Sequence, residues 1–148
     1  MFKKSIIASV VFMCALQAHA ACVIHSESPS SKIGKMITAS AGWTFNNYEE
    51  ICRKVNAANA EIVILGNSTV LENKSIAWAS ISIKDRNLPI YSNAFSGVST
   101  MVNSYASQDQ ADKMLMEAVN NAIENLVIDK AVMTLDRARK EVKTAYGK

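Results

Sequence analysis

Three residues toward the N-terminal end of the chain could carry out chemistry: Cys22, His25 and Cys52. A thiol three residues from an imidazole could form a nucleophilic Cys–His pair, and two thiols could instead join as a disulfide. A cysteine that directly follows an export signal could also carry a lipid. Which of these holds depends on the compartment and on the elements that position the two sulfurs.

Residues 1–20 have the pattern of a secretory signal peptide. Lys3 and Lys4 form a positive start, residues 6–16 form an apolar stretch too short to span a bilayer, and residues 18–20 form a small-x-small cleavage site. We therefore expect a periplasmic or secreted protein whose mature chain, 21–148, is one domain without a membrane-spanning segment. Removing Lys3 and Lys4 leaves 14 basic residues against 13 acidic ones, a net charge of +1. This balance gives no electrostatic reason to expect a nucleic-acid partner.

Once Cys14 has left with the signal, Cys22 and Cys52 are the remaining cysteines. In an oxidising compartment two cysteines most simply form one disulfide, so we predict a bond between them. His19 stands where a lipoprotein signal carries an aliphatic residue, which disfavours lipidation of Cys22. Lipidation and a free thiol stay open as alternatives.

The rest of the mature chain offers no recognisable catalytic constellation. His25 is its single histidine, and one imidazole with two cysteines falls short of the three or four ligands that a metal site needs. No glycine-rich phosphate loop, nucleophile elbow or zinc-protease motif is present. We therefore expect no enzymatic activity, no metal and no cofactor.

The first strong helical pattern covers residues 48–58, where one apolar face includes Cys52. Asn47 and Glu50 resemble a capping box at its start. This face directs Cys52 toward the core, so a disulfide to Cys22 would tie the N-terminal arm to the buried side of the helix. The segment before it, residues 26–44, is rich in serine and small residues and predicts a loop with one helical turn.

Two strands are predicted at residues 61–71 and 75–84, joined by a turn at residues 72–74. The run 62–65 is apolar on both faces, so we expect the sheet to be covered on both sides there. Residues 88–95 predict a short third strand, placed at an edge because of Pro89. Residues 97–106 read as a surface loop.

A long helix should begin after Ser107, which forms a capping box with Gln110. Its apolar stripes lose register near residues 125–129, so either the helix bends there or residues 128–148 form a separate helix. The second stripe is a short coiled-coil-like seam that would pack on its own domain or, alternatively, against a partner or a second copy. The seam residues proposed for such a partner helix are Ile128, Leu135 and Val142.

The predicted fold class is α+β: a small, mainly antiparallel sheet of three or four strands, packed against an N-terminal helix and a long C-terminal helix, with one disulfide. Loops on a rigid scaffold often carry binding residues. The candidate binding surface is therefore the loop region before Ser107, with the side chains of Tyr91, Phe95, Met101 and Tyr105. The alternative is that these side chains fold back as a lid over the sheet.

The order of elements over residues 46–127 resembles the small periplasmic α/β domains of bacterial envelope-assembly proteins, such as the penicillin-binding-protein activator lipoproteins and the curli-secretion lipoproteins. The positions that carry the resemblance are Ala60, Glu61, Gly66, Asp85, Ser107, Ala111 and Ala122. The chain departs from the pattern in lacking a lipobox and a glycine after Asp85. The resemblance implies a non-catalytic binding module.

We therefore expect an exported accessory protein that binds a protein partner of the cell envelope. The alternative is a secreted inhibitor or immunity protein that blocks a toxin or a hydrolase. The sequence does not identify the partner.

Overall fold

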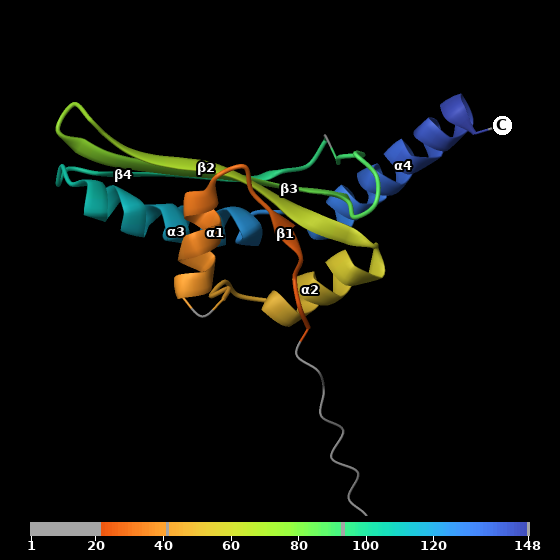
Figure 1. Ribbon diagram of the computed structural model, residues 1–148, viewed down its shortest axis with the longest axis horizontal. Coiled ribbons are helices and arrows are strands. Elements are labelled where there is room, and N and C mark those ends of the chain that lie inside the picture. Colours follow the sequence, from red (N-terminus) through yellow and green to blue (C-terminus); the bar gives the residue numbers. More distant parts are fainter. Residues whose placement is uncertain (1–21, 41, 93, 148) are drawn as a thin grey trace, which may run out of the picture.

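The structure is a computed structural model that describes residues 22–40, 42–92 and 94–147 (Figure 1). It confirms the predicted α+β class with a four-stranded, mostly antiparallel sheet. Along the chain, the elements are β1 (Ser26–Glu27), α1 (Ser31–Ala39), α2 (Tyr48–Ala57), β2 (Ala60–Leu71), β3 (Lys74–Asp85), β4 (Gly97–Asn103), α3 (Gln108–Glu124) and α4 (Ile128–Tyr146).

The sheet is built around one long hairpin, and its strand order is β1-β2-β3-β4. β2 and β3 pair over their full length, from Ala60 opposite Asp85 to Leu71 opposite Lys74. The two turn residues, Glu72 and Asn73, both have positive φ, as the tightest two-residue hairpin turn requires. The predicted strands and turn are thus confirmed. The short β1 runs parallel to β2 and adds a two-residue edge strand to the sheet.

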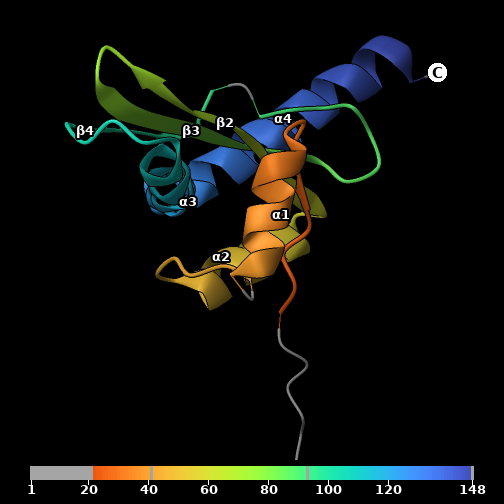
Figure 2. The same cartoon turned by 60° about the vertical axis from the view of Figure 1, so that its left-hand side comes forward.

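Helices α1, α2 and α3 lie on one face of the sheet (Figures 1 and 2). Burial alternates strictly along β3, as expected when only one face of a strand packs on a core. The largest fully buried side chains are Ile33, Ile62, Ile64, Ile81, Ile83, Leu115, Ile123 and Leu135. They form one core between the sheet and the helices.

Small residues allow α3 to lie very close to the sheet. Ala118 and Ala122 are fully buried, and a Cβ added at Gly97 of β4 would lie 1.7 Å from the Ala122 carbonyl oxygen. A Cβ at Gly66 would lie 2.8 Å from the Trp78 carbonyl oxygen, so this glycine marks a close backbone approach. Glycine at these two positions is required by space.

Three local predictions were wrong. Residues 31–39 form the nine-residue helix α1 where a loop with one helical turn was expected, because Ile33 packs into the core near Gly66 and Leu115. Residues 97–103 form strand β4 where a surface loop was expected, because they pair with residues 75–81 of β3. The third strand expected in 88–95 is reduced to one isolated bridge, Lys84 to Tyr91.

The helix boundaries gave mixed results. Ser107 caps α3 by accepting a hydrogen bond from the Gln110 backbone, as predicted. Asn47 does not cap α2, since it lies in the left-handed region and its side chain makes no cap hydrogen bond. The loss of register near 125–129 corresponds to a true break, because α3 ends at Glu124 and α4 begins at Ile128.

Candidate functional site

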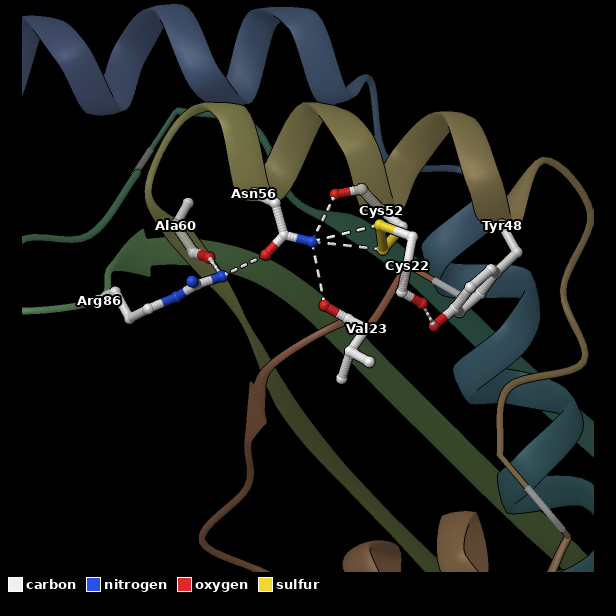
Figure 3. The surroundings of a disulfide bond; sticks show 7 residues. All are labelled: Cys22, Val23, Tyr48, Cys52, Asn56, Ala60 and Arg86. Atoms are coloured by element: carbon white, nitrogen blue, oxygen red, sulfur yellow. Dashed lines mark hydrogen bonds between the residues drawn. A yellow bond between two sulfur atoms is a disulfide. The ribbon is translucent and has the colours of Figure 1, made fainter. Parts of the chain in front are cut away.

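The predicted disulfide is present: Cys22 is bonded to Cys52, with 6.1 Å between their Cα atoms (Figure 3). Cys52 is fully buried on α2, and the Tyr48 hydroxyl donates a hydrogen bond to the Cys22 carbonyl at 2.7 Å. The bond therefore fastens the segment before β1 to α2. Because both sulfurs are used, neither can serve as a thiolate for a pair with His25, whose side chain is exposed.

The Asn56 amide is the polar centre beside this disulfide (Figure 3). Its Nδ2 donates to the carbonyls of Val23 and Cys52, both at 3.0 Å, and lies 3.3 Å from both sulfurs. Its Oδ1 accepts a hydrogen bond from Arg86 at 2.6 Å, and Arg86 also donates to the Ala60 carbonyl at 3.0 Å. This amide joins the N-terminal segment, α2 and the end of the hairpin, which is a structural role.

An ion pair between the buried Asp85 carboxylate and the partly exposed Arg139 guanidinium fixes α4 to the end of the hairpin. Arg139 donates to Asp85 at 2.7 Å and to the Ala58 carbonyl at the C-terminal end of α2 at 2.8 Å. Burial raises the pKa of Asp85. The backbone N–H groups of Asn87 and Leu88 and the Arg139 guanidinium outweigh that effect, so the pKa lies below its ordinary value. Asp85 is thus held as a carboxylate that anchors the C-terminal helix.

A second polar cluster joins α1, β2 and α3, and the sequence reasoning missed it. One oxygen of Asp112 accepts hydrogen bonds from Lys32 at 2.5 Å, from Ser68 at 2.7 Å and from Gln108 at 2.6 Å. Burial raises the pKa of Asp112, but these donors outweigh it and leave the pKa below its ordinary value. The sequence feature that could have revealed this cluster is Ser68, a polar residue on the inward side of β2.

This cluster also places Lys32 Nζ 3.0 Å from Ser68 Oγ. A serine nucleophile can use lysine as its base only when the amine is neutral. Here the same ammonium is paired with Asp112, so it holds no free electron pair for the Ser68 proton. The arrangement favours a structural bridge between elements.

Within residues 22–40, 42–92 and 94–147, no three His, Cys, Asp or Glu side chains gather into a group able to hold a metal ion. In the same part of the chain, no helix combines the length and the apolar character needed to cross a membrane.

The second face of the sheet is open: no helix of the described chain lies over it in either view (Figures 1 and 2). Five apolar side chains on this face of the described chain are largely exposed: Leu65 (46%), Leu71 (58%), Trp78 (41%), Val98 (54%) and Val102 (60%). Val63 is buried, but Leu65 is not, so the prediction that both faces are covered over residues 62–65 was wrong for Leu65.

These side chains are neighbours across three strands. Ser80 of β3 lies opposite Leu65 of β2 and opposite Val98 of β4, so Trp78 is diagonal to both. Ile76 lies opposite Val102 in the same way. We call Leu65, Ile76, Trp78, Val98 and Val102 the open-face patch. Isolated exposed apolar residues are common on protein surfaces, whereas contiguous ones mark interaction sites.

The four residues of the predicted loop surface are dispersed. Tyr91 bridges to Lys84 at one end of β3, whereas Tyr105 lies at the other end, where its carbonyl accepts a hydrogen bond from Ser75. Nine residues of extended strand between these points span about 30 Å. Phe95 and Met101 are partly buried against the core. The four side chains therefore do not line one exposed surface.

The predicted partner-helix residues are divided between two environments. Ile128 and Leu135 are buried, and this first half of α4 packs near α2 and β3. Val142 is exposed, and the end of the helix extends away from the sheet (Figure 1). The first half of the seam thus belongs to the chain's own core.

No protein-family model, curated protein or solved structure gives a significant match to this chain. The resemblance to the envelope-assembly lipoprotein domains remains a hypothesis based on the sequence pattern.

Proposed function

We propose that this chain is a non-catalytic, exported protein-binding module of the bacterial cell envelope, and that the open-face patch is its binding surface. The observation that carries the proposal is the exposure of Trp78 at the centre of a contiguous apolar patch on a rigid sheet. Tryptophan is the residue type most enriched among those that dominate binding energy at protein interfaces. The patch also has polar surroundings, which suit the rim of such an interface.

Charge at the two ends of the patch supports a protein partner over a lipid surface. Lys84 is paired with Glu27 and with Glu61 at one end of the open face, so this lysine is already neutralised. Lys74 lies at the other end, in the hairpin. A face with so few free cations has little attraction for anionic lipid, which binds clusters of basic residues.

Export is supported by the N-terminal pattern of residues 1–20 and by the disulfide. Disulfides form and persist mainly in oxidising compartments, and Cys22 would lie next to the new N-terminus after cleavage. The expected result is a periplasmic form that begins at Ala21, identified by its intact mass. Recovery of the chain only from the cytoplasm, with residues 1–20 retained, would contradict export.

The binding proposal is tested by in-cell photo-crosslinking. A photoreactive amino acid at position 78 should capture one specific protein, identified by mass spectrometry, and the same residue at position 133 should not, because Met133 is exposed on α4 away from the patch. With the purified partner, Trp78→Arg should weaken binding by about 30-fold, the loss expected at a central interface residue. Met133→Arg is the matched control and should bind as the wild type does.

Equal binding by the wild type and Trp78→Arg would refute the patch as the site. The identity of the captured protein also decides between the two functions. A toxin or a hydrolase whose activity falls on binding would support the alternative, an inhibitor or immunity protein. An envelope-assembly protein would support the accessory role.

A further inference from the structure

The outer edge of β4 lacks the charged residues, proline and bulge that usually protect an edge strand. The Asn125 amide donates to its Val98 carbonyl at 3.2 Å and leaves that carbonyl a second lone pair. β4 is the last strand of the sheet and pairs on one side only, with β3. Natural edge strands are usually blunted by charged residues, proline, a bulge or a very short length. β4 has seven residues without charge or proline, and its register with β3 runs without interruption from Asn103 to Gly97. The stretch of sequence without a charged residue extends over residues 87–108.

The opposite edge of the sheet is protected at β1. β1 has only two residues, and Glu27 within it forms an ion pair with Lys84. Beyond β1, residues 64–71 of β2 carry neither charge nor proline, as in β4.

The sequence of β4 is complementary to itself in an antiparallel pair. If two copies of β4 pair about a two-fold axis at Thr100, Val98 of each copy lies opposite Val102 of the other, and Ser99 lies opposite Met101. Val98, Thr100 and Val102 are all exposed on the open face, so on this face valine would lie opposite valine and threonine opposite threonine. β-Branched pairs of this kind stabilise a sheet.

We propose that the chain forms a homodimer through antiparallel β4–β4 pairing centred on Thr100, which joins the two four-stranded sheets into one of eight strands. The two open-face patches then meet at the dimer axis through their valines. A predicted mature charge of +1 per chain gives negligible repulsion between copies. The dimer concerns the edge of the sheet and goes beyond the binding partner proposed above, since it needs no other protein.

The register is tested by single cysteine substitutions in the full-length chain, purified in its disulfide-bonded form and treated with a mild oxidant. In the proposed pair the two Thr100 Cα atoms lie about 4.5–5.5 Å apart, within disulfide range. Thr100→Cys should therefore form a covalent dimer in high yield. In Val98→Cys the two new sulfurs are four residues apart along the strands, about 13 Å, so this variant should stay at the wild-type baseline. Equal cross-linking of both variants, or none by Thr100→Cys, would overturn the proposal.

Sedimentation of the unmodified chain tests the dimer without oxidant. At about 100 µM chain the wild type should be mainly dimeric, a modest affinity suited to a small interface. Thr100→Lys places two like charges face to face at the axis and should reduce the association constant at least about tenfold. Thr69→Lys is the matched control, because Thr69 is exposed on β2, away from this edge, and it should sediment as the wild type does.

Circular dichroism of both lysine variants verifies that they are folded, and only folded variants are compared. A monomeric wild type at this concentration would overturn the proposal, and so would a Thr100→Lys variant that stays dimeric. A wild-type dimer with no partner captured at position 78 would refute the proposed function and leave the dimer intact.

Discussion

Reduction of the Cys22–Cys52 disulfide should lower the free energy of unfolding by about 3.7 kcal/mol, the chain-entropy value for a loop of about 30 residues at 25 °C. The two cysteines are 30 residues apart in sequence. The loop that they close contains β1, α1 and the start of α2, so opening it gives the unfolded chain many more conformations. A loss of this size is a large part of the stability of a typical domain.

Replacing both cysteines by alanine should cost more than reduction does. Cys52 is fully buried, so removing its sulfur leaves a small void and takes a contact from Asn56. The lost packing should lower the free energy of unfolding by about 1 kcal/mol more than reduction of the disulfide does. The reduced wild type and the Cys22→Ala, Cys52→Ala double variant therefore separate the chain-entropy contribution from the packing contribution.

Urea unfolding followed by tryptophan fluorescence measures both losses. Trp43 is a suitable probe because it is partly buried and lies 5.8 Å from the Phe45 ring, close to the start of α2. Reductant should shift the wild-type midpoint and leave the double variant unchanged, which serves as the control. The denatured, oxidised chain should show no reactive thiol at either position. A reduced wild type within about 1 kcal/mol of the oxidised form would refute the loop-closure reasoning.

Two further predictions concern β4 and the anchor of α4. Gly97→Ala should destabilise the fold by about 3 kcal/mol, because its Cβ would collide with the Ala122 carbonyl. Gly34→Ala meets nothing within 4 Å in helix α1 and should stabilise by about 0.5–1 kcal/mol; thermal melts compare the two, and equal effects would contradict the close approach. Asp85→Asn should cost about 2 kcal/mol at pH 7, because it removes the charged acceptor of a hydrogen bond from Arg139. The folded pKa of Asp85 lies below the unfolded value of about 3.9, so its contribution is present above that pH and is lost as the pH falls through the folded pKa. Urea midpoints from pH 7 down to pH 2 should thus fall less steeply for Asp85→Asn than for the wild type, and an identical acid dependence would contradict this assignment.

The sequence predicted the hairpin because its signals are local. Residues 60–71 and 74–85 combine β-branched side chains with a turn that tolerates positive φ, and neither signal depends on the rest of the fold. The disulfide was predictable because two cysteines remain after the export signal, and local helical periodicity places Cys52 on the inner face of α2.

The missed elements are those that packing stabilises against weak local preference. α1 contains Gly34 and follows Pro29, yet Ile33 is fully buried and holds the helix against the sheet. β4 is rich in serine and threonine, and its pairing with β3 depends on contacts across more than 15 residues of sequence. The open-face patch was missed for the same reason, because a run that is apolar on both faces does not reveal which face another element covers.

The position of α4 explains why one face of the sheet stays open. A helix of 19 residues is about 28 Å long, enough to cross the three long strands and cover Trp78. Instead, its apolar start packs near α2 and β3, and Arg139 joins Asp85 and the C-terminal end of α2. Separating this pair would leave the buried Asp85 carboxylate without its cation, which is costly. The same contacts that stabilise α4 thus keep it off the open face and leave the patch exposed.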